Sequence, residues 1–309
     1  MSTAAGRRWS RRRLIWAGIG GLAGIAAAGA GGLELVDHGV LPGRQLLAGL
    51  DGACAVTVPP ARLAAIPGPT LSGSFYSQAR RRVVGYEIAF PPGERPGGKA
   101  LPLIVALHGF GGDHATTLFE ITPAQALALR IDGRPLPPMA MVTVDGGPGY
   151  WNPHPGDDPM GMVIDELIPM CGRLGLGGGH RVGALGISMG GFGALLFAER
   201  YPRLFRAVAA IAPAVWTSYA QARGANGGAF ASAAAFAADD VVSHAGGLAG
   251  VAVRVASGID DPFYPGVRAL AGALPGGSVT DFGPGCHDAS FFASQQPPSL
   301  AFLGRHLAG

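Results

Sequence analysis

The sequence predicts an α/β fold in which a mostly parallel central sheet is covered by helices on both faces. From residue 101 onward, short apolar runs alternate with longer segments of helical character, and this alternation is typical of parallel sheets. A G-x-S-x-G motif at residues 186–190 joins one apolar run to one helical segment. Of the 309 residues 48% are hydrophobic, which is ample for one large core and argues against disorder.

The expected elements begin with a hairpin formed by residues 72–78 and 83–90, whose turn contains the arginine run 80–82. The strands that follow are expected as short apolar runs at residues 101–107, 139–144, 181–187, 207–211, 251–256 and 278–282. Helices are expected at residues 117–130, 159–171, 189–200, 265–274 and 290–307, with Pro123 interrupting or restarting the first and Pro169 interrupting the second.

An insertion rich in alanine and glycine occupies residues 216–250. It is expected to form either a small cap over the functional site or ordinary surface helix and loop. The fold is therefore expected to have a small cap or none.

The amino terminus has the pattern of an export segment. Five of the first 13 residues are arginines, with a twin-arginine arrangement around Arg11 and Arg12, and a weakly hydrophobic run covers residues 14–33. Residues 1–33 are expected to be a twin-arginine export signal or an uncleaved N-terminal anchor. Residues 34–70, interrupted by prolines, are expected to be an irregular lead-in, and residues 71–309 the folded domain.

The formal net charge of +3 comes from this amino terminus. With its five arginines set aside, 18 of the 23 basic residues remain against 20 acidic residues, so the rest of the chain is slightly acidic. No nucleic-acid partner is expected. The N-terminal segment instead favours association with a membrane or the cell envelope.

Three cysteines are present, so at most one internal disulfide can form. An exported protein can oxidise its thiols, and Cys54 with Cys286 is the expected pair. Cys171 is expected to be a small buried residue at a helix end. The spacing indicates no metal site, and no cofactor is expected.

The motif Gly186-Ile187-Ser188-Met189-Gly190 lies between a predicted buried strand and a predicted helix that ends before Pro202. Strand, tight turn and helix are the context of the nucleophile elbow of α/β-hydrolases. The serine occupies a strained turn that raises its hydroxyl above the sheet edge. Side chains two residues away on either side would collide there, which explains Gly186 and Gly190.

A serine nucleophile requires a base and an orienting carboxylate, which in this fold follow in the order Ser, Asp or Glu, His. Asp260 and Asp261 follow the predicted strand at 251–256, and His287 follows the strand at 278–282. Of the eight histidines, only His287 fits this order and position. Position alone does not separate the two aspartates.

Two N–H groups are expected to form an oxyanion hole, which stabilises the negative charge of the intermediate. One should come from Met189, directly after the nucleophile. The other should come from Phe110, in the loop H-G-F-G-G that follows the strand at 101–107.

Substrate contacts are expected from residues that follow other strands. Asp145, Tyr150 and Trp151 come after the strand at 139–144, and Trp216 comes after residues 212–214. These side chains could wall the acyl or alcohol pocket, although Asp145-Gly146 fits an ordinary turn equally well.

Six sequence blocks, in this order, resemble the esterase D group of α/β-hydrolases, which includes S-formylglutathione hydrolases and is related to secreted actinobacterial mycolyltransferases. The blocks are L-H-G-F-G-G, D-G-G-P-G-Y-W-N, G-I-S-M-G-G-F-G-A-L, Y-P-R-L-F, G-I-D-D-P-F and G-C-H-D-A-S-F-F, within residues 86–307. The resemblance implies Asp261, the second aspartate of D-D-x-F, as the triad acid. The chain differs from cytosolic S-formylglutathione hydrolases in having an export segment. It differs from mycolyltransferases in having an aspartate, not a glutamate, as the expected triad acid.

The sequence therefore predicts an exported serine esterase that hydrolyses a small-molecule or lipid ester through an acyl-enzyme. One alternative is an acyltransferase, in which a sugar or lipid hydroxyl replaces water. Another is a non-catalytic protein that uses a hydrolase fold to bind envelope lipid or glycan. The triad is the same for the first two, so the sequence does not separate them.

Overall fold

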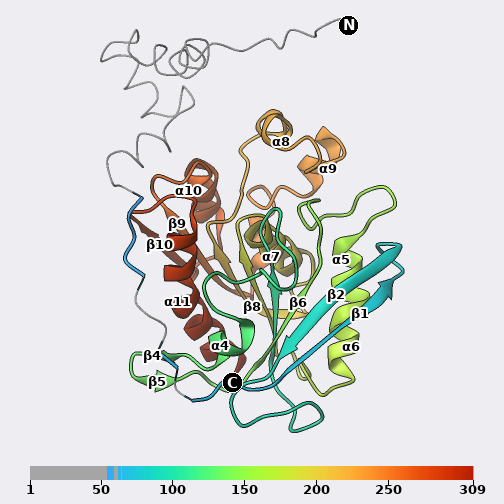
Figure 1. The fold of residues 1–309 in the computed structure, drawn as a ribbon. Coiled ribbons are helices and arrows are strands. Elements are labelled where there is room, and N and C mark those ends of the chain that lie inside the picture. Colours follow the sequence, from blue (N-terminus) through green and yellow to red (C-terminus); the bar gives the residue numbers. More distant parts are fainter. Residues whose placement is uncertain (1–53, 59–61, 64, 309) are drawn as a thin grey trace, which may run out of the picture. The chain divides into compact units, whose positions relative to one another are not determined.

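The computed structural model describes residues 54–58, 62–63 and 65–308 (Figure 1). The expected export segment at residues 1–33, and the lead-in as far as residue 53, lie outside the described residues. Every helix and strand below belongs to one compact unit, Ala53–Gly309.

An eight-stranded sheet forms the centre of this unit, in the order β1-β2-β6-β3-β7-β8-β9-β10. β1 and β2 form an antiparallel hairpin, β2 pairs antiparallel with β6, and the other neighbours are parallel. The strands are β1 (Thr70–Ser77), β2 (Arg82–Ala89), β3 (Leu103–Leu107), β6 (Ala140–Val144), β7 (Val182–Ile187), β8 (Phe205–Ile211), β9 (Ala252–Gly258) and β10 (Val279–Gly283). The expected mostly parallel sheet is therefore confirmed.

Helices cover both faces of the sheet, because β3, β6 and β7 are buried along their whole length and need apolar partners on each side. One core contains residues of α5 (Pro159–Gly161), α7 (Met189–Arg200) and α10 (Tyr264–Ala273). The second core contains residues of α4 (Pro123–Leu127) and α11 (Ala289–Leu307). Figure 1 shows α11 and α4 on the near face of the sheet.

The helix expected at residues 117–130 is wrong over most of its length. Only Pro123–Leu127 is helical, because Thr122 caps the helix in a reciprocal capping box with Gln125 and Pro123 occupies the first turn. The residues after α4 form a separate two-stranded sheet of β4 (Arg130–Ile131) and β5 (Arg134–Pro135).

Pro169 does not break the helix expected at residues 159–171. α5 continues through a π-helical turn, η1 (Met162–Leu167), into α6 (Ile168–Gly172). The N–H of Ile168 bonds to the carbonyl of Val163, five residues earlier. This wider turn lets the chain pass the proline without a break.

The insertion forms three short helices, α8 (Tyr219–Ala225), α9 (Ala233–Ala238) and η2 (Ala245–Leu248). Its buried Phe230 packs edge-on against Phe192 of α7, with ring centroids 5.8 Å apart. It is thus a small addition to the sheet core, not a domain. Within the described part of the chain, no helix combines the length and hydrophobicity needed to cross a bilayer.

The expected disulfide between Cys54 and Cys286 is present and joins residues 232 positions apart. It ties the start of the described chain to the loop that carries His287. Cys171 is a free, buried thiol in the last turn of α6, as expected. Burial raises the pKa of the Cys171 thiol to about 12, so this side chain stays neutral.

Candidate active site

Ser188 lies in a strained backbone conformation between β7 and α7. Its φ of 57° and ψ of −119° fall outside the regions that residues with a side chain favour. A Cβ on Gly186 would lie 1.9 Å from the carbonyl oxygen of Gly190, and a Cβ on Gly190 would lie 2.0 Å from that of Leu107. Only glycine fits at these two positions, which is the steric reason expected for the motif.

Three side chains from separate loops meet at this turn. The hydroxyl Oγ of Ser188 lies 2.8 Å from Nε2 of His287, and Nδ1 of His287 lies 2.7 Å from Oδ2 of Asp261. Since the carboxylate can only accept, His287 donates from Nδ1 and its Nε2 is left to accept a proton from the hydroxyl. This is the geometry by which a base activates a serine.

Asp261, rather than Asp260, faces the histidine. Asp261 is 1% exposed, and its second carboxylate oxygen, Oδ1, accepts a hydrogen bond of 2.8 Å from the N–H of Phe263. With both oxygens occupied, the carboxylate is held in one orientation. Asp260 bonds instead through its backbone N–H to the carbonyl of Gly285.

The two expected oxyanion donors come from the turn after β3 and from the start of α7. Met189 is the first residue of α7, where a helix leaves its N–H groups without helical partners. Phe110 lies in the turn after β3, and its side chain is 61% exposed. None of the described loop and turn hydrogen bonds uses the N–H of either residue.

His108 is a residue whose contribution the sequence did not reveal. It is fully buried behind the loop that carries Phe110. Its Nδ1 lies 2.8 Å from the carbonyl of Gly109, and its Nε2 accepts a hydrogen bond of 2.9 Å from the N–H of Gly146. The imidazole therefore connects the loop after β3 to the loop after β6.

Burial is the largest influence on His108 and lowers its pKa below the ordinary value. The side chain thus stays neutral, donating from Nδ1 and accepting at Nε2. Its position directly after a buried strand is the available signal in the sequence, although its place before the serine excludes it as the triad base.

Trp151 does not lie in a pocket wall, where it is expected from the sequence. Its side chain is fully buried, so it offers no surface to a substrate in this conformation. Its Nε1 donates to the carbonyl of His108 over 3.2 Å, and its ring packs on the His108 ring at 5.0 Å. Trp151 supports the loop after β3 from below.

Asp145 is also committed to internal contacts. Its carboxylate accepts hydrogen bonds from the N–H of Gly85 and from the N–H of His114, and it pairs with Nδ1 of His114 at 2.7 Å. These contacts tie the loop after β6 to the hairpin and to the loop after β3, a structural role that its turn-like sequence left open.

Aromatic rings border the histidine. The ring of Phe263 lies 5.0 Å from His287 and 4.7 Å from Trp216, and Trp216 lies 6.4 Å from Tyr150. Burial raises the pKa of Tyr150 to about 12, so its phenol stays protonated. Trp216 is thus linked to the triad histidine through one ring, Phe263.

Comparison with known proteins agrees with this architecture. Residues 165–269 match the family model described as "Putative esterase". An S-formylglutathione hydrolase from Agrobacterium tumefaciens superposes with a TM-score of 0.63 at 18% identity, covering 82% of this chain and 100% of that chain. No curated protein sequence matches the chain.

Two further solved structures each cover 77% of this chain and 98% of their own, both with a TM-score of 0.58. One is a ferulic acid esterase at 20% identity, and the other is fluorophosphonate-binding serine hydrolase F of Staphylococcus aureus at 16% identity. At these identities the likeness shows the α/β-hydrolase fold.

The fold and the esterase match together define the class of protein: a carboxylic ester hydrolase built on the α/β-hydrolase fold. Within that class, the match and the neighbours confirm the resemblance to the esterase D group.

Proposed function

We propose that the protein is an exported serine esterase in which Ser188, His287 and Asp261 form the catalytic triad. The observation that supports this most directly is the unbroken hydrogen-bonded chain from the buried Asp261 carboxylate through His287 to the Ser188 hydroxyl. The strained backbone of Ser188 adds support, because such strain is found where a nucleophile must be presented.

In the first half of the reaction, Oγ of Ser188 attacks the ester carbonyl carbon while Nε2 of His287 takes the hydroxyl proton. The carbonyl oxygen becomes an oxyanion, which the N–H groups of Phe110 and Met189 stabilise. Asp261 keeps His287 in the required tautomer and stabilises its positive charge. The bond to the leaving alcohol then breaks, and His287 returns the proton to that oxygen.

In the second half, water attacks the acyl carbon of the acyl-enzyme and gives its proton to Nε2 of His287. The bond to Oγ of Ser188 breaks, the carboxylic acid leaves, and the serine regains its proton. Every step uses side chains and backbone groups of this chain together with ester and water.

Trp216 and Phe263 are the proposed walls of the substrate pocket, because their rings connect to His287. The names of the structural neighbours include an S-formylglutathione hydrolase and a ferulic acid esterase, which differ in the acyl group that the name states. A panel of p-nitrophenyl esters of increasing acyl length, tested on the wild type and on Trp216→Ala, would define the acyl preference.

Export is proposed from the arginine cluster and the apolar run at residues 14–33. The disulfide between Cys54 and Cys286 supports it, because such bonds persist in oxidising compartments. A fusion of the first 53 residues to a reporter should be exported, and replacement of Arg11 and Arg12 by lysine should retain the reporter in the cytoplasm.

Ser188→Ala tests the catalytic proposal. It should lower kcat for a p-nitrophenyl ester by on the order of 10⁴-fold or more and abolish labelling by a fluorophosphonate probe. Ser72→Ala is the matched control, since Ser72 lies on the exposed hairpin and its hydroxyl donates to the Glu87 carboxylate. Wild-type turnover in Ser188→Ala would contradict the triad.

The same preparation tests the two alternatives. Hydrolysis in the presence of concentrated glycerol or trehalose should give mainly free acid, and a dominant acylated acceptor would identify an acyltransferase instead. A folded wild type that neither turns over esters nor reacts with the probe would point to the non-catalytic binding function.

A further inference from the structure

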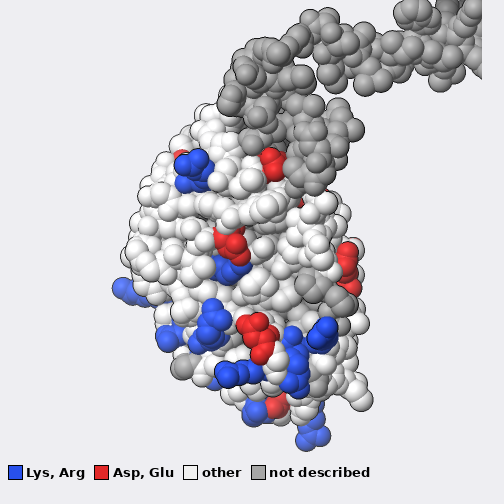
Figure 2. Space-filling view, turned by 90° about the vertical axis from the view of Figure 1, so that its left-hand side faces the viewer, with Lys and Arg blue, Asp and Glu red and all other residues white. Residues whose placement is uncertain are grey.

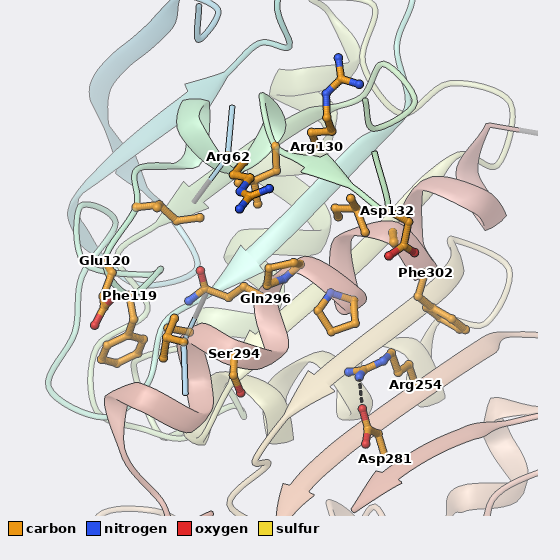
Figure 3. Close-up of a pocket in the computed structure, with 18 of the residues that line it drawn as sticks. Arg62, Phe119, Glu120, Arg130, Asp132, Arg254, Asp281, Ser294, Gln296 and Phe302 are labelled. Carbon is orange, nitrogen blue, oxygen red and sulfur yellow. Dashed lines mark hydrogen bonds and ion pairs between the residues drawn. The ribbon is translucent and has the colours of Figure 1, made fainter. Parts of the chain in front are cut away.

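A pocket of about 880 Å³ lies between α11, β10 and the segment around β4 (Figure 3). Ser188, Asp261 and His287 are not among its lining residues, so it is separate from the triad. Its volume falls within the range of about 300–1,000 Å³ that is usual for small-molecule sites. Apolar side chains form much of its wall, including those of Phe119, Ile121, Leu129, Ile131, Pro297 and Phe302.

Four arginines line the pocket against three acidic residues. Arg254 is occupied by Asp281, Gln295 and Ser299, and Arg130 donates to the carbonyl of Gly133. The guanidinium groups of Arg62 and Arg305 form no hydrogen bond or ion pair with any residue that the structure describes. Figure 2 shows Lys and Arg side chains gathered on the lower half of this face of the molecule.

Gln296 provides an independent observation. Its side chain is 1% exposed and lines the pocket, yet its amide Nε2 has no hydrogen-bond partner among the described residues. A buried N–H group without a partner is costly, so such groups are rare in folded proteins. In Figure 3, Gln296 and Arg62 extend into the same end of the pocket, and the Glu120 carboxylate is directed away from them.

The backbone holds Arg62 at this place. Its carbonyl accepts a hydrogen bond of 2.8 Å from the N–H of Arg130, and Leu63 pairs antiparallel with Leu129. Among the described residues, the pocket thus has a cation and an amide donor without partners at one end, and an apolar wall along α11. Charged donors of this kind bind carboxylate and phosphate oxygens strongly.

We propose that this pocket binds an anionic amphiphile: a carboxylate or phosphate headgroup bonded to Arg62 and to the Gln296 amide, with its alkyl chain along Leu129, Ile131, Pro297 and Phe302. This site does not depend on the proposed triad, and a failure of Ser188→Ala to lose activity would leave it unaffected.

Calorimetric titration of the full-length protein with octanoate, octyl phosphate and 1-octanol tests the proposal. Both anions should bind with one-to-one stoichiometry, and octanol, which lacks the charge, at least tenfold more weakly. Arg62→Gln should weaken the anions about tenfold and leave octanol nearly unchanged. The tighter of the two anions identifies whether a carboxylate or a phosphate is the natural headgroup.

Ala301→Trp, which places a large ring inside the pocket, should abolish binding of all three compounds. Arg181→Gln is the matched control, because Arg181 does not line the pocket and should leave every affinity unchanged. Thermal unfolding and hydrolysis of a short p-nitrophenyl ester report correct folding. Should Ala301→Trp unfold, Gln296→Leu replaces it and should weaken the two anions but not octanol.

Three results would overturn the proposal. One is the absence of octanoate and octyl phosphate binding at millimolar concentration. Another is octanol binding as tightly as the anions. The third is unchanged anion affinity both in folded Arg62→Gln and in Ala301→Trp, or in Gln296→Leu where that variant is used instead. Such a result would mean that the anions bind elsewhere, for example at the Ser188 site.

Discussion

The Ser188 site and the pocket beside α11 differ in how their polar groups are used. Around the serine, His287, Asp261 and His108 each have hydrogen-bond partners within the protein. In the α11 pocket, among the described residues, the Arg62 guanidinium and the Gln296 Nε2 have none. The triad side chains are thus satisfied within the protein, whereas the pocket beside α11 has polar groups without partners among the described residues.

This difference indicates what each site can do. Satisfied polar groups are fixed in place before a substrate arrives, which is what stabilisation of a transition state requires. Unsatisfied groups carry a free-energy cost that a ligand can remove by bonding to them. The first arrangement suits catalysis. The second suits binding of a ligand that carries hydrogen-bond acceptors.

Gly190→Ala should produce the largest effect, because it would disrupt the turn that holds Ser188. The new Cβ would lie 2.0 Å from the carbonyl oxygen of Leu107 and 2.7 Å from that of His108, so backbone must move. We expect a loss of about 3 kcal/mol in the free energy of unfolding, together with most of the esterase activity. Denaturant unfolding and ester hydrolysis measure both.

Gly272→Ala is the control for that variant, because Gly272 lies in α10 and no heavy atom would approach its Cβ within 4 Å. It should be neutral or stabilising by up to about 1 kcal/mol. Equal destabilisation by both alanines would show that the crowding around Gly190 is not the cause.

His108→Leu should have an intermediate effect. It would leave polar groups without hydrogen-bond partners near Ser188, as in the pocket beside α11. The N–H of Gly146 would lose its acceptor, at a cost of about 1–3 kcal/mol. With the Phe110 loop less firmly held, kcat should fall roughly tenfold with little change in KM. His108→Gln, whose amide can donate and accept, should restore most of both.

The pH dependence of stability tests the same residue. Burial lowers the pKa of His108 from its ordinary 6.5 in the folded protein, so the unfolded chain binds the proton more readily. The contribution of the neutral imidazole to stability is therefore complete above pH about 6.5 and is lost as pH falls below it. His108→Gln should lose this part of the dependence between pH 7 and 5, and an unchanged profile would contradict it.

Gln296→Leu should have the smallest effect on stability and tests the second site. Removing a buried amide whose N–H has no partner among the described residues should leave the free energy of unfolding unchanged or raise it by about 1 kcal/mol. Its neighbour Gln295, which accepts from Arg254, is the control, and Gln295→Leu should be destabilising. A clear loss of stability in Gln296→Leu would mean that its amide is already satisfied.

Much of the fold can be predicted from local sequence, because strands, helices and the nucleophile elbow depend on neighbouring residues. The expected strands and the α7 helix match the observed elements within a few residues. The segment at 117–130 has apolar spacing that suits a helix, but Thr122 caps a helix that begins only at Pro123, and the chain turns into β4 soon after Leu127. The sequence does not decide the place of Trp151, because an aromatic residue after a strand can enter either a pocket or the core.

The sequence by itself determined the order Ser188, Asp261, His287 on successive loops, since a parallel sheet brings the ends of its strands to one edge. Only the tertiary structure decided what lies around them: Asp261 bonded to the histidine while Asp260 turns to Gly285, Trp151 beneath the loop after β3, and Arg62 with Gln296 at one pocket end. These contacts join residues far apart in the chain, and no local pattern encodes which of them will touch.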